Sequence, residues 1–168
     1  TVAQACRAAV SQSVDIFNLH ATGGSAMMVA AAEATAVAYQ ELLRVEPNAS
    51  KPALIAVTIL TSMTAKTLSE ELNVSLPLDK MVTYLAKLAQ QSKLDGVVAS
   101  AQEATAIRES CGDDFLIITP GIRPSWAEAN DQARIVTPRD AIARGADYIV
   151  VGRPIVKAPD RVAAARKI

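Results

Sequence analysis

Apolar residues along the chain gather in five short runs that are rich in Val and Ile and show little alternation with polar residues. Such runs are typical of strands buried on both faces, as in a parallel sheet covered by helices. The runs are Val14–Leu19, Ala53–Leu60, Gly96–Ala99, Phe115–Thr119 and Tyr148–Val151. We therefore expect five buried strands.

Helical patterns separate these runs. Ser25–Arg44 is long and rich in Ala, and Leu78–Ser92 carries Met81, Leu85 and Leu88 at helical spacing. The first residues, Thr1–Val10, and the last, Asp160–Ile168, also read as helices. Each predicted strand after the first is therefore preceded by a helical segment.

Three segments carry signals for a helix start. Ser100-Ala-Gln-Glu103 fits a capping box, in which Ser and Glu accept each other's free amides. Thr137-Pro-Arg-Asp140 places a cap residue before a proline, with an acid in the first turn. Asp160 is a candidate cap for the final helix.

The alternation of strands and helices predicts right-handed βαβ units and a parallel sheet. A doubly wound open sheet and a (β/α) barrel both fit, and the barrel is favoured because candidate ligand groups end several strands. Five strands cannot close an eight-stranded barrel. We therefore expect either an open sheet or part of a longer protein.

Composition and charge narrow the function classes. Of 168 residues, 51% are hydrophobic, and 17 Lys and Arg balance 17 Asp and Glu, so no basic surplus supports nucleic acid binding. No apolar run reaches the roughly 18 residues of a membrane span, and no segment resembles a signal peptide. Cys6, Cys111 and the single His20 lack metal-site spacing, which indicates a cytoplasmic protein with reduced thiols and no metal.

Two strand ends carry the most informative chemistry. Phe115–Thr119 is followed by Gly121 and Arg123, and Tyr148–Val151 by Gly152 and Arg153. Glycine lets a ligand approach the backbone, and an arginine fork suits a phosphate. Because ligands bind at the carboxyl ends of parallel strands, this pattern predicts a site for a phosphorylated small molecule.

Several segments, taken in order, resemble one enzyme family. They are Asn18-Leu-His-Ala-Thr-Gly-Gly24, Ala56-Val-Thr-Ile-Leu-Thr-Ser-Met63, Asp95-Gly-Val-Val-Ala-Ser-Ala-Gln-Glu-Ala104, Thr119-Pro-Gly-Ile-Arg-Pro124, Asp131-Gln132 and Val151-Gly-Arg-Pro154. Together they resemble the orotidine 5′-monophosphate decarboxylases. That resemblance implies a (β/α)8 barrel, a homodimer, no metal or organic cofactor, and conversion of orotidine 5′-monophosphate to uridine 5′-monophosphate and carbon dioxide.

The resemblance also implies where the chain starts within the family's barrel. Thr1 followed by Val2 looks like the end of the family signature Asp-x-Lys-x-x-Asp-Ile-Pro-Asn-Thr. Residues 1–168 would then form one partial α/β domain with strands four to eight and without the first three. The catalytic Lys and its carboxylates would lie outside these residues, so we expect the 168 residues alone to be inactive.

By the same resemblance, Arg153 and the Gly152 amide would hold the substrate's 5′-phosphate, and Gln132 would reach it from a loop spanning roughly Pro124 to Arg134. Arg123 would belong to the substrate site. Thr61 or Ser62 would face the nucleotide. Thr1 resembles the threonine that crosses the dimer interface to complete the partner's site.

Structural roles compete with these assignments. The competing role of Arg153 and Arg123 is an ion pair, and that of one of Thr61 and Ser62 is a helix cap. His20 is expected to support the barrel mouth by hydrogen bonding. Asp15, Asp95 and Asp147 stand just before strands, opposite the ligand edge, which favours capping or pairing over acid–base chemistry.

Two other functions remain open at this stage. One is a related phosphate-binding barrel that acts on a sugar phosphate. The other is a fragment without catalytic activity that binds a nucleotide weakly. The Thr61-Ser62 segment and Gln132 favour the nucleotide over a sugar phosphate.

Overall fold

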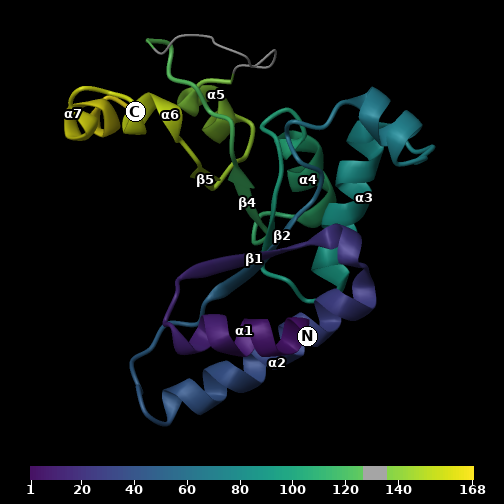
Figure 1. Ribbon diagram of the computed structural model, residues 1–168, viewed down its shortest axis with the longest axis vertical. Coiled ribbons are helices and arrows are strands. Elements are labelled where there is room, and N and C mark those ends of the chain that lie inside the picture. The colour runs from purple at the N-terminus through teal and green to yellow at the C-terminus, as the bar shows by residue number, and fades with distance from the viewer. Residues whose placement is uncertain (127–135) are drawn as a thin grey trace.

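The fold is organised around five parallel strands, which we describe from a computed structural model that covers residues 1–126 and 136–168 (Figure 1). The strands are β1 (Ile16–His20), β2 (Ala53–Val57), β3 (Gly96–Val98), β4 (Leu116–Thr119) and β5 (Tyr148–Ile149). All five lie within or next to the predicted runs. The parallel sheet is therefore confirmed.

The order of the strands distinguishes between the two α/β architectures. Each strand pairs with its neighbour in the sequence, from β1 through β5, and every pair is parallel. A doubly wound sheet reverses its order at a switch point, whereas the wall of a barrel does not. The sheet has the order of a barrel wall, as favoured from the sequence.

Helices fill the connections between the strands. They are α1 (Val2–Ser11), α2 (Ser25–Leu43), α3 (Leu78–Gln91), α4 (Ala104–Cys111), α5 (Pro138–Ala143), α6 (Arg153–Val156) and α7 (Arg161–Arg166). A 3₁₀ turn, Ala21–Gly23, precedes α2, and a π-helical turn, Thr67–Glu71, precedes α3. Figure 1 shows α1 beside α2 at one end of the molecule and α5, α6 and α7 at the other.

The main core lies between the sheet and its helices. Leu19, Ala56, Val97 and Ile117 stand side by side on four neighbouring strands and pack in one cluster with residues of α2, α3 and α4. The alternate row runs from His20 on β1 to Tyr148 on β5, and both of these end residues are exposed. Side chains alternate between faces along a strand, so the described helices pack against one face.

Of the three predicted helix starts, two are confirmed and one is wrong. Thr137 and Asp160 each accept an amide three residues ahead, from Asp140 at 3.2 Å and from Ala163 at 2.9 Å, so both caps are confirmed. The capping box at Ser100 is wrong. The Ser100 hydroxyl accepts the Gln102 amide at 3.2 Å, and α4 starts only at Ala104 without a side-chain cap. Five residues, 99–103, therefore separate β3 from α4.

Asp95 and Asp147 link neighbouring strands at their amino ends. One Asp95 carboxylate oxygen accepts the Leu54 amide at 2.8 Å, and the other accepts Lys51 Nζ at 2.8 Å. Asp147 accepts the Ile117 amide and Arg108 Nη2, both at 2.7 Å. Their predicted structural role is confirmed.

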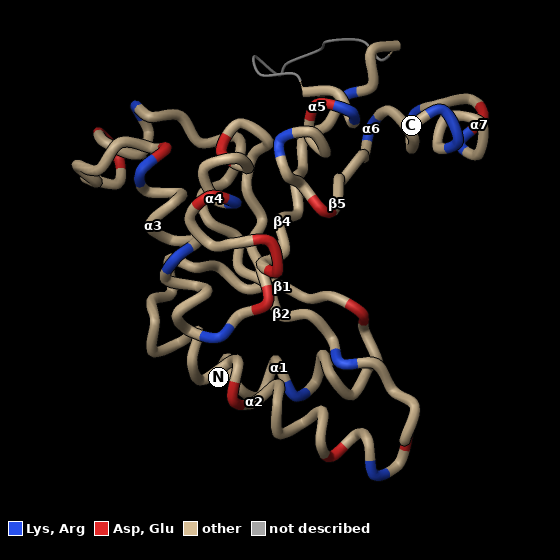
Figure 2. The backbone as a smooth tube through the Cα atoms, turned by 180° about the vertical axis from the view of Figure 1, so that it is seen from behind, with Lys and Arg blue, Asp and Glu red and all other residues tan. Residues whose placement is uncertain are grey.

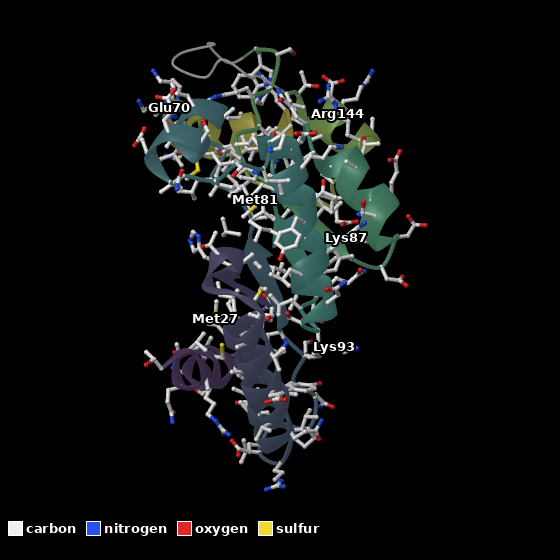
Figure 3. All side chains as sticks on the ribbon, turned by 90° about the vertical axis from the view of Figure 1, so that its right-hand side faces the viewer. Met27, Glu70, Met81, Lys87, Lys93 and Arg144 are labelled. Carbon is white, nitrogen blue, oxygen red and sulfur yellow. The ribbon has the colours of Figure 1, made fainter. Side chains whose placement is uncertain are left out.

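Charged residues of both signs are distributed along the whole backbone (Figure 2). Glu70 lies in the turn before α3 and Lys93 in the turn after it, so the two residues mark opposite ends of the segment that contains α3 (Figure 3). Among residues 1–126 and 136–168, no helix is both long and apolar enough to cross a membrane.

Candidate functional site

A cavity of about 360 Å³ lies at the carboxyl ends of β2, β3 and β4. Its lining comes from the segments that follow these three strands, from the start of α3 and from Val136. Ligands of parallel α/β proteins bind at this edge of the sheet. The cavity is therefore the candidate site within the described part of the chain.

Thr61 and Ser62 line this cavity, as their position after a strand predicts. Both are exposed, and they stand in a turn that the Met63 amide closes on the Leu60 carbonyl at 2.9 Å. The helix cap suspected in this region belongs instead to Thr64, whose Oγ1 accepts the Thr67 amide at 3.1 Å. Thr61 and Ser62 therefore belong to the cavity lining, and the cap bond in this region is made by Thr64.

Arg123 is the most unusual side chain near the cavity. It follows Gly121 and Ile122, which line the cavity, and its backbone amide donates to Val136 O at 3.0 Å. Only 6% of the residue is exposed, and its Nε has no hydrogen-bond partner among the described residues. A buried guanidinium is costly unless an anion or acceptor pairs with it. The competing role of Arg123 is an ion pair at the base of the loop. No such ion pair is found for Arg123 among the described residues.

Gly152 and Arg153 follow β5, at the same edge of the sheet. The Val150 amide donates to Thr119 O at 2.8 Å, which fixes this segment beside the end of β4. Arg153 is exposed and begins α6.

The glycine at position 152 has no packing reason in the described structure. A Cβ there would meet no described atom within 4 Å. By contrast, a Cβ at Gly96 would lie 2.4 Å from Leu116 O, so that glycine is required by strand packing. The open space beside Gly152 leaves room for a ligand to approach the backbone closely.

The other predicted residues lie elsewhere. Thr1 is exposed and precedes α1 without a capping side-chain bond, and it does not line the cavity. His20 is exposed at the end of β1. Gln132 lies outside the described residues.

Two polar cavity residues in the segment after β3 were not predicted as site residues. Ser100 and Glu103 line the cavity from the segment after β3, and Glu103 is only 8% exposed. Both had been assigned to a capping box. Their position after a strand, the same signal that identified Thr61 and Ser62, would have been sufficient to find them.

Other parts of the described chain offer weaker chemistry. Burial raises the pKa of the Cys6 and Cys111 thiols, which disfavours nucleophilic thiolates, and neither lines the cavity. No group of His, Cys, Asp and Glu in residues 1–126 and 136–168 is arranged to hold a metal ion. A second hollow, of about 470 Å³, lies at the amino ends of the strands, where Lys51 is already paired with Asp95.

The chain resembles known proteins over its whole length. The model of the "Orotidine 5'-phosphate decarboxylase / HUMPS family" matches residues 1–168. The chain is 51% identical over 168 residues to an orotidine 5′-phosphate decarboxylase of Trichlorobacter lovleyi, and 48% identical to one of Moorella thermoacetica. All of this chain is matched in both cases, but only 66% and 65% of the two relatives.

Solved structures agree with this likeness. A crystal structure of orotidine 5′-phosphate decarboxylase from Lactobacillus acidophilus matches with a TM-score of 0.83 at 37% identity, over 99% of this chain and 66% of that chain. A second, of an uncharacterized conserved protein from Geobacillus kaustophilus, gives a TM-score of 0.79 at 38% identity, over 99% of this chain and 67% of that one. The chain thus spans about two thirds of the length of the proteins it matches.

Proposed function

Because the chain belongs to the orotidine 5′-phosphate decarboxylase / HUMPS family, we propose that its protein converts orotidine 5′-monophosphate to uridine 5′-monophosphate and carbon dioxide. The 168 residues supply the wall of the barrel that binds the nucleotide and its phosphate. The family's catalytic Lys and flanking carboxylates belong to strands outside these residues. No residue of this segment is proposed to transfer the proton.

The observation that best supports this proposal is the buried Arg123, which directly follows the cavity residues Gly121 and Ile122 at the ligand edge. Only 6% of the residue is exposed, and its Nε lacks a partner in the described structure. A bound anionic nucleotide offers the acceptor that the described residues do not. Gly152, which no described neighbour requires to be glycine, adds a second point of close approach.

The roles follow from these positions. Arg153 and the Gly152 amide hold the 5′-phosphate, with Gln132 contributing from the segment after β4. Arg123 contacts the substrate from the neighbouring strand end, and Thr61 or Ser62 donates to the pyrimidine or ribose. The binding energy of the phosphate offsets the free-energy cost of positioning the substrate and excluding water. It thereby lowers the barrier at the distant reacting carbon.

The proposal extends to assembly. The protein acts as a cytoplasmic homodimer without metal or organic cofactor, and residues 1–168 form strands four to eight of one barrel domain. Thr1, which is exposed and lies away from the described cavity, contributes to the partner's site.

The direct test is the Arg153→Ala variant of the longer protein. We expect kcat/KM for orotidine 5′-monophosphate to fall more than tenfold, or about 1.4 kcal/mol of transition-state stabilisation, since a phosphate contact is lost. Arg139→Ala, which removes an exposed arginine of α5, is the matched control and should leave kcat/KM unchanged.

A substrate analogue without the phosphate separates phosphate binding from a structural effect. The Arg153→Ala variant and the wild-type protein should process that analogue equally well. Unchanged kinetics with the full substrate would contradict the phosphate assignment. Inhibition by a pentulose phosphate, without inhibition by uridine 5′-monophosphate, would contradict the assignment of a nucleotide substrate.

A further inference from the structure

Three of the turns that lead into strands have the same local structure. In each, a residue with positive φ is followed by an apolar residue and then by an aspartate directly before the strand. The turns are Ser13-Val14-Asp15 before β1, Lys93-Leu94-Asp95 before β3 and Gly145-Ala146-Asp147 before β5, with φ of 51°, 67° and 101° at the first residue. They precede alternate strands of the sheet.

In two of the three turns, the aspartate binds the preceding strand twice. The Asp95 amide donates to Leu54 O at 2.8 Å, while its carboxylate accepts the Leu54 amide at 2.8 Å. Asp147 does the same with Ile117, at 2.9 Å and 2.7 Å. Each aspartate thus holds the one residue opposite it, and that residue is a buried aliphatic.

Asp15 has the backbone placement of these two residues. Its carbonyl accepts the Ala53 amide of β2 at 2.8 Å, just as the Asp95 carbonyl accepts the Leu116 amide of β4 at 3.0 Å. Its other side is the open edge of β1, which pairs with no further strand among the described residues. Asp15 is exposed, and in the described structure its carboxylate has no hydrogen bond that matches those of Asp95 and Asp147.

We propose that Asp15 is a strand-binding residue, whose carboxylate and amide together hold one residue of a further parallel strand along the open edge of β1. By analogy with Leu54 and Ile117, the bound residue is aliphatic and not proline, because it must donate its amide. A basic side chain is expected nearby, in the role that Lys51 and Arg108 play for the other two aspartates.

The occupant is a strand of the protein's own polypeptide from outside these 168 residues. Roughly a third of each relative's length lies outside the matched region, which is ample for such a strand. A second copy of β1 fits less well. Two β1 edges related by a two-fold axis perpendicular to the sheet run antiparallel, which would put Asp15 against the far end of its partner. The inference rests on the geometry of the turns and does not require the proposed catalytic activity.

The test compares variants of the protein in the longest form that the cell produces. Asp15→Ala should lower Tm by about 3 °C, because one charge-assisted hydrogen bond is lost, and Asp95→Ala should lower Tm at least as much. It should also speed hydrogen exchange of the Ile16–His20 amides by about tenfold or more. Asp15→Asn keeps an acceptor oxygen and should retain most of both properties.

Asp114→Ala is the matched control, since this exposed aspartate also lies near the amino ends of the strands. The proposal is overturned if Asp15→Ala changes Tm and exchange no more than Asp114→Ala does. It is also overturned if the β1 amides of the wild-type protein exchange at the rate of unpaired amides. If Asp15→Ala fails to fold, a folded Asp15→Asn supports the acceptor role, and an unfolded one overturns it.

Discussion

At the scale of single residues, two largely buried arginines differ in the hydrogen bonding of their guanidinium groups. Arg108 is 17% exposed in its side chain and donates to the carbonyls of Gly112, Asp113, Phe115 and Gly145, as well as to Asp147. Arg123 is more deeply buried, but its Nε has no acceptor in the described structure. Arg108 thus stabilises the fold through its hydrogen bonds, whereas the buried Nε of Arg123 costs stability as long as it has no acceptor.

Replacing these arginines by methionine should therefore shift stability in opposite directions. Arg123→Met removes a buried charge and leaves an apolar side chain that fills part of the same space. The free energy of unfolding should therefore rise by about 1 kcal/mol, while affinity for uridine 5′-monophosphate falls. Arg108→Met should lower it by about 2 kcal/mol, since five acceptors lose their donor. Urea denaturation and calorimetric titration measure both effects. A less stable Arg123→Met protein would contradict the unpaired state of this side chain.

At the scale of elements, glycines at two strand ends serve different purposes. Gly96 starts β3 and lets its backbone pass against Leu116 of β4, whereas Gly152 follows β5 beside open space. Alanine at the first position must push two strands apart. Alanine at the second meets no described atom of the protein.

We accordingly expect Gly96→Ala to lower the free energy of unfolding by about 2 kcal/mol, through overpacking. Gly152→Ala should leave it within about 0.5 kcal/mol, yet weaken nucleotide binding by about tenfold, because the new Cβ stands where the phosphate approaches. Thermal unfolding and binding titrations on the same samples separate the two effects. Equal nucleotide affinity in Gly152→Ala and wild type would exclude a close approach there.

The elements that the sequence predicted well are those whose residues have one favourable environment. Dense runs such as Leu54–Val57 fit only a buried strand, and Thr137 before Pro138 fits only a helix start. Ser100 and Glu103 fit two environments, a capping box and a ligand cavity, and the local pattern could not distinguish between them. The cavity depends on how separate segments meet, as does the burial of Arg123, and neither is encoded in a single segment.

At the scale of the whole molecule, the described sheet has two open edges, at β1 and β5, with exposed His20 and Tyr148 on the same face. Unpaired strand edges reduce stability and favour association. The site residues Thr61, Arg123 and Arg153 stand on separate strand ends, so their mutual geometry depends on the sheet as a whole.

We therefore expect the 168-residue chain, purified alone, to release no carbon dioxide from orotidine 5′-monophosphate and to bind uridine 5′-monophosphate at least tenfold more weakly than the longer protein. Measured release of carbon dioxide and calorimetric titration check the two statements. Turnover by the 168 residues alone would mean that this segment contains its own proton donor, contrary to the proposed division of roles.

The aspartates that precede alternate strands also have a consequence for how the protein can be taken apart. Asp95 joins β3 to β2, and Asp147 joins β5 to β4, whereas Pro52 and Phe115 occupy the corresponding positions before β2 and β4. The side-chain links thus join β3 to β2 and β5 to β4. A chain break in the exposed turn at residues 44–48, between α2 and β2, would cut none of these links. That turn is the natural place to divide the gene for a split reporter whose halves reassemble along the β1–β2 seam.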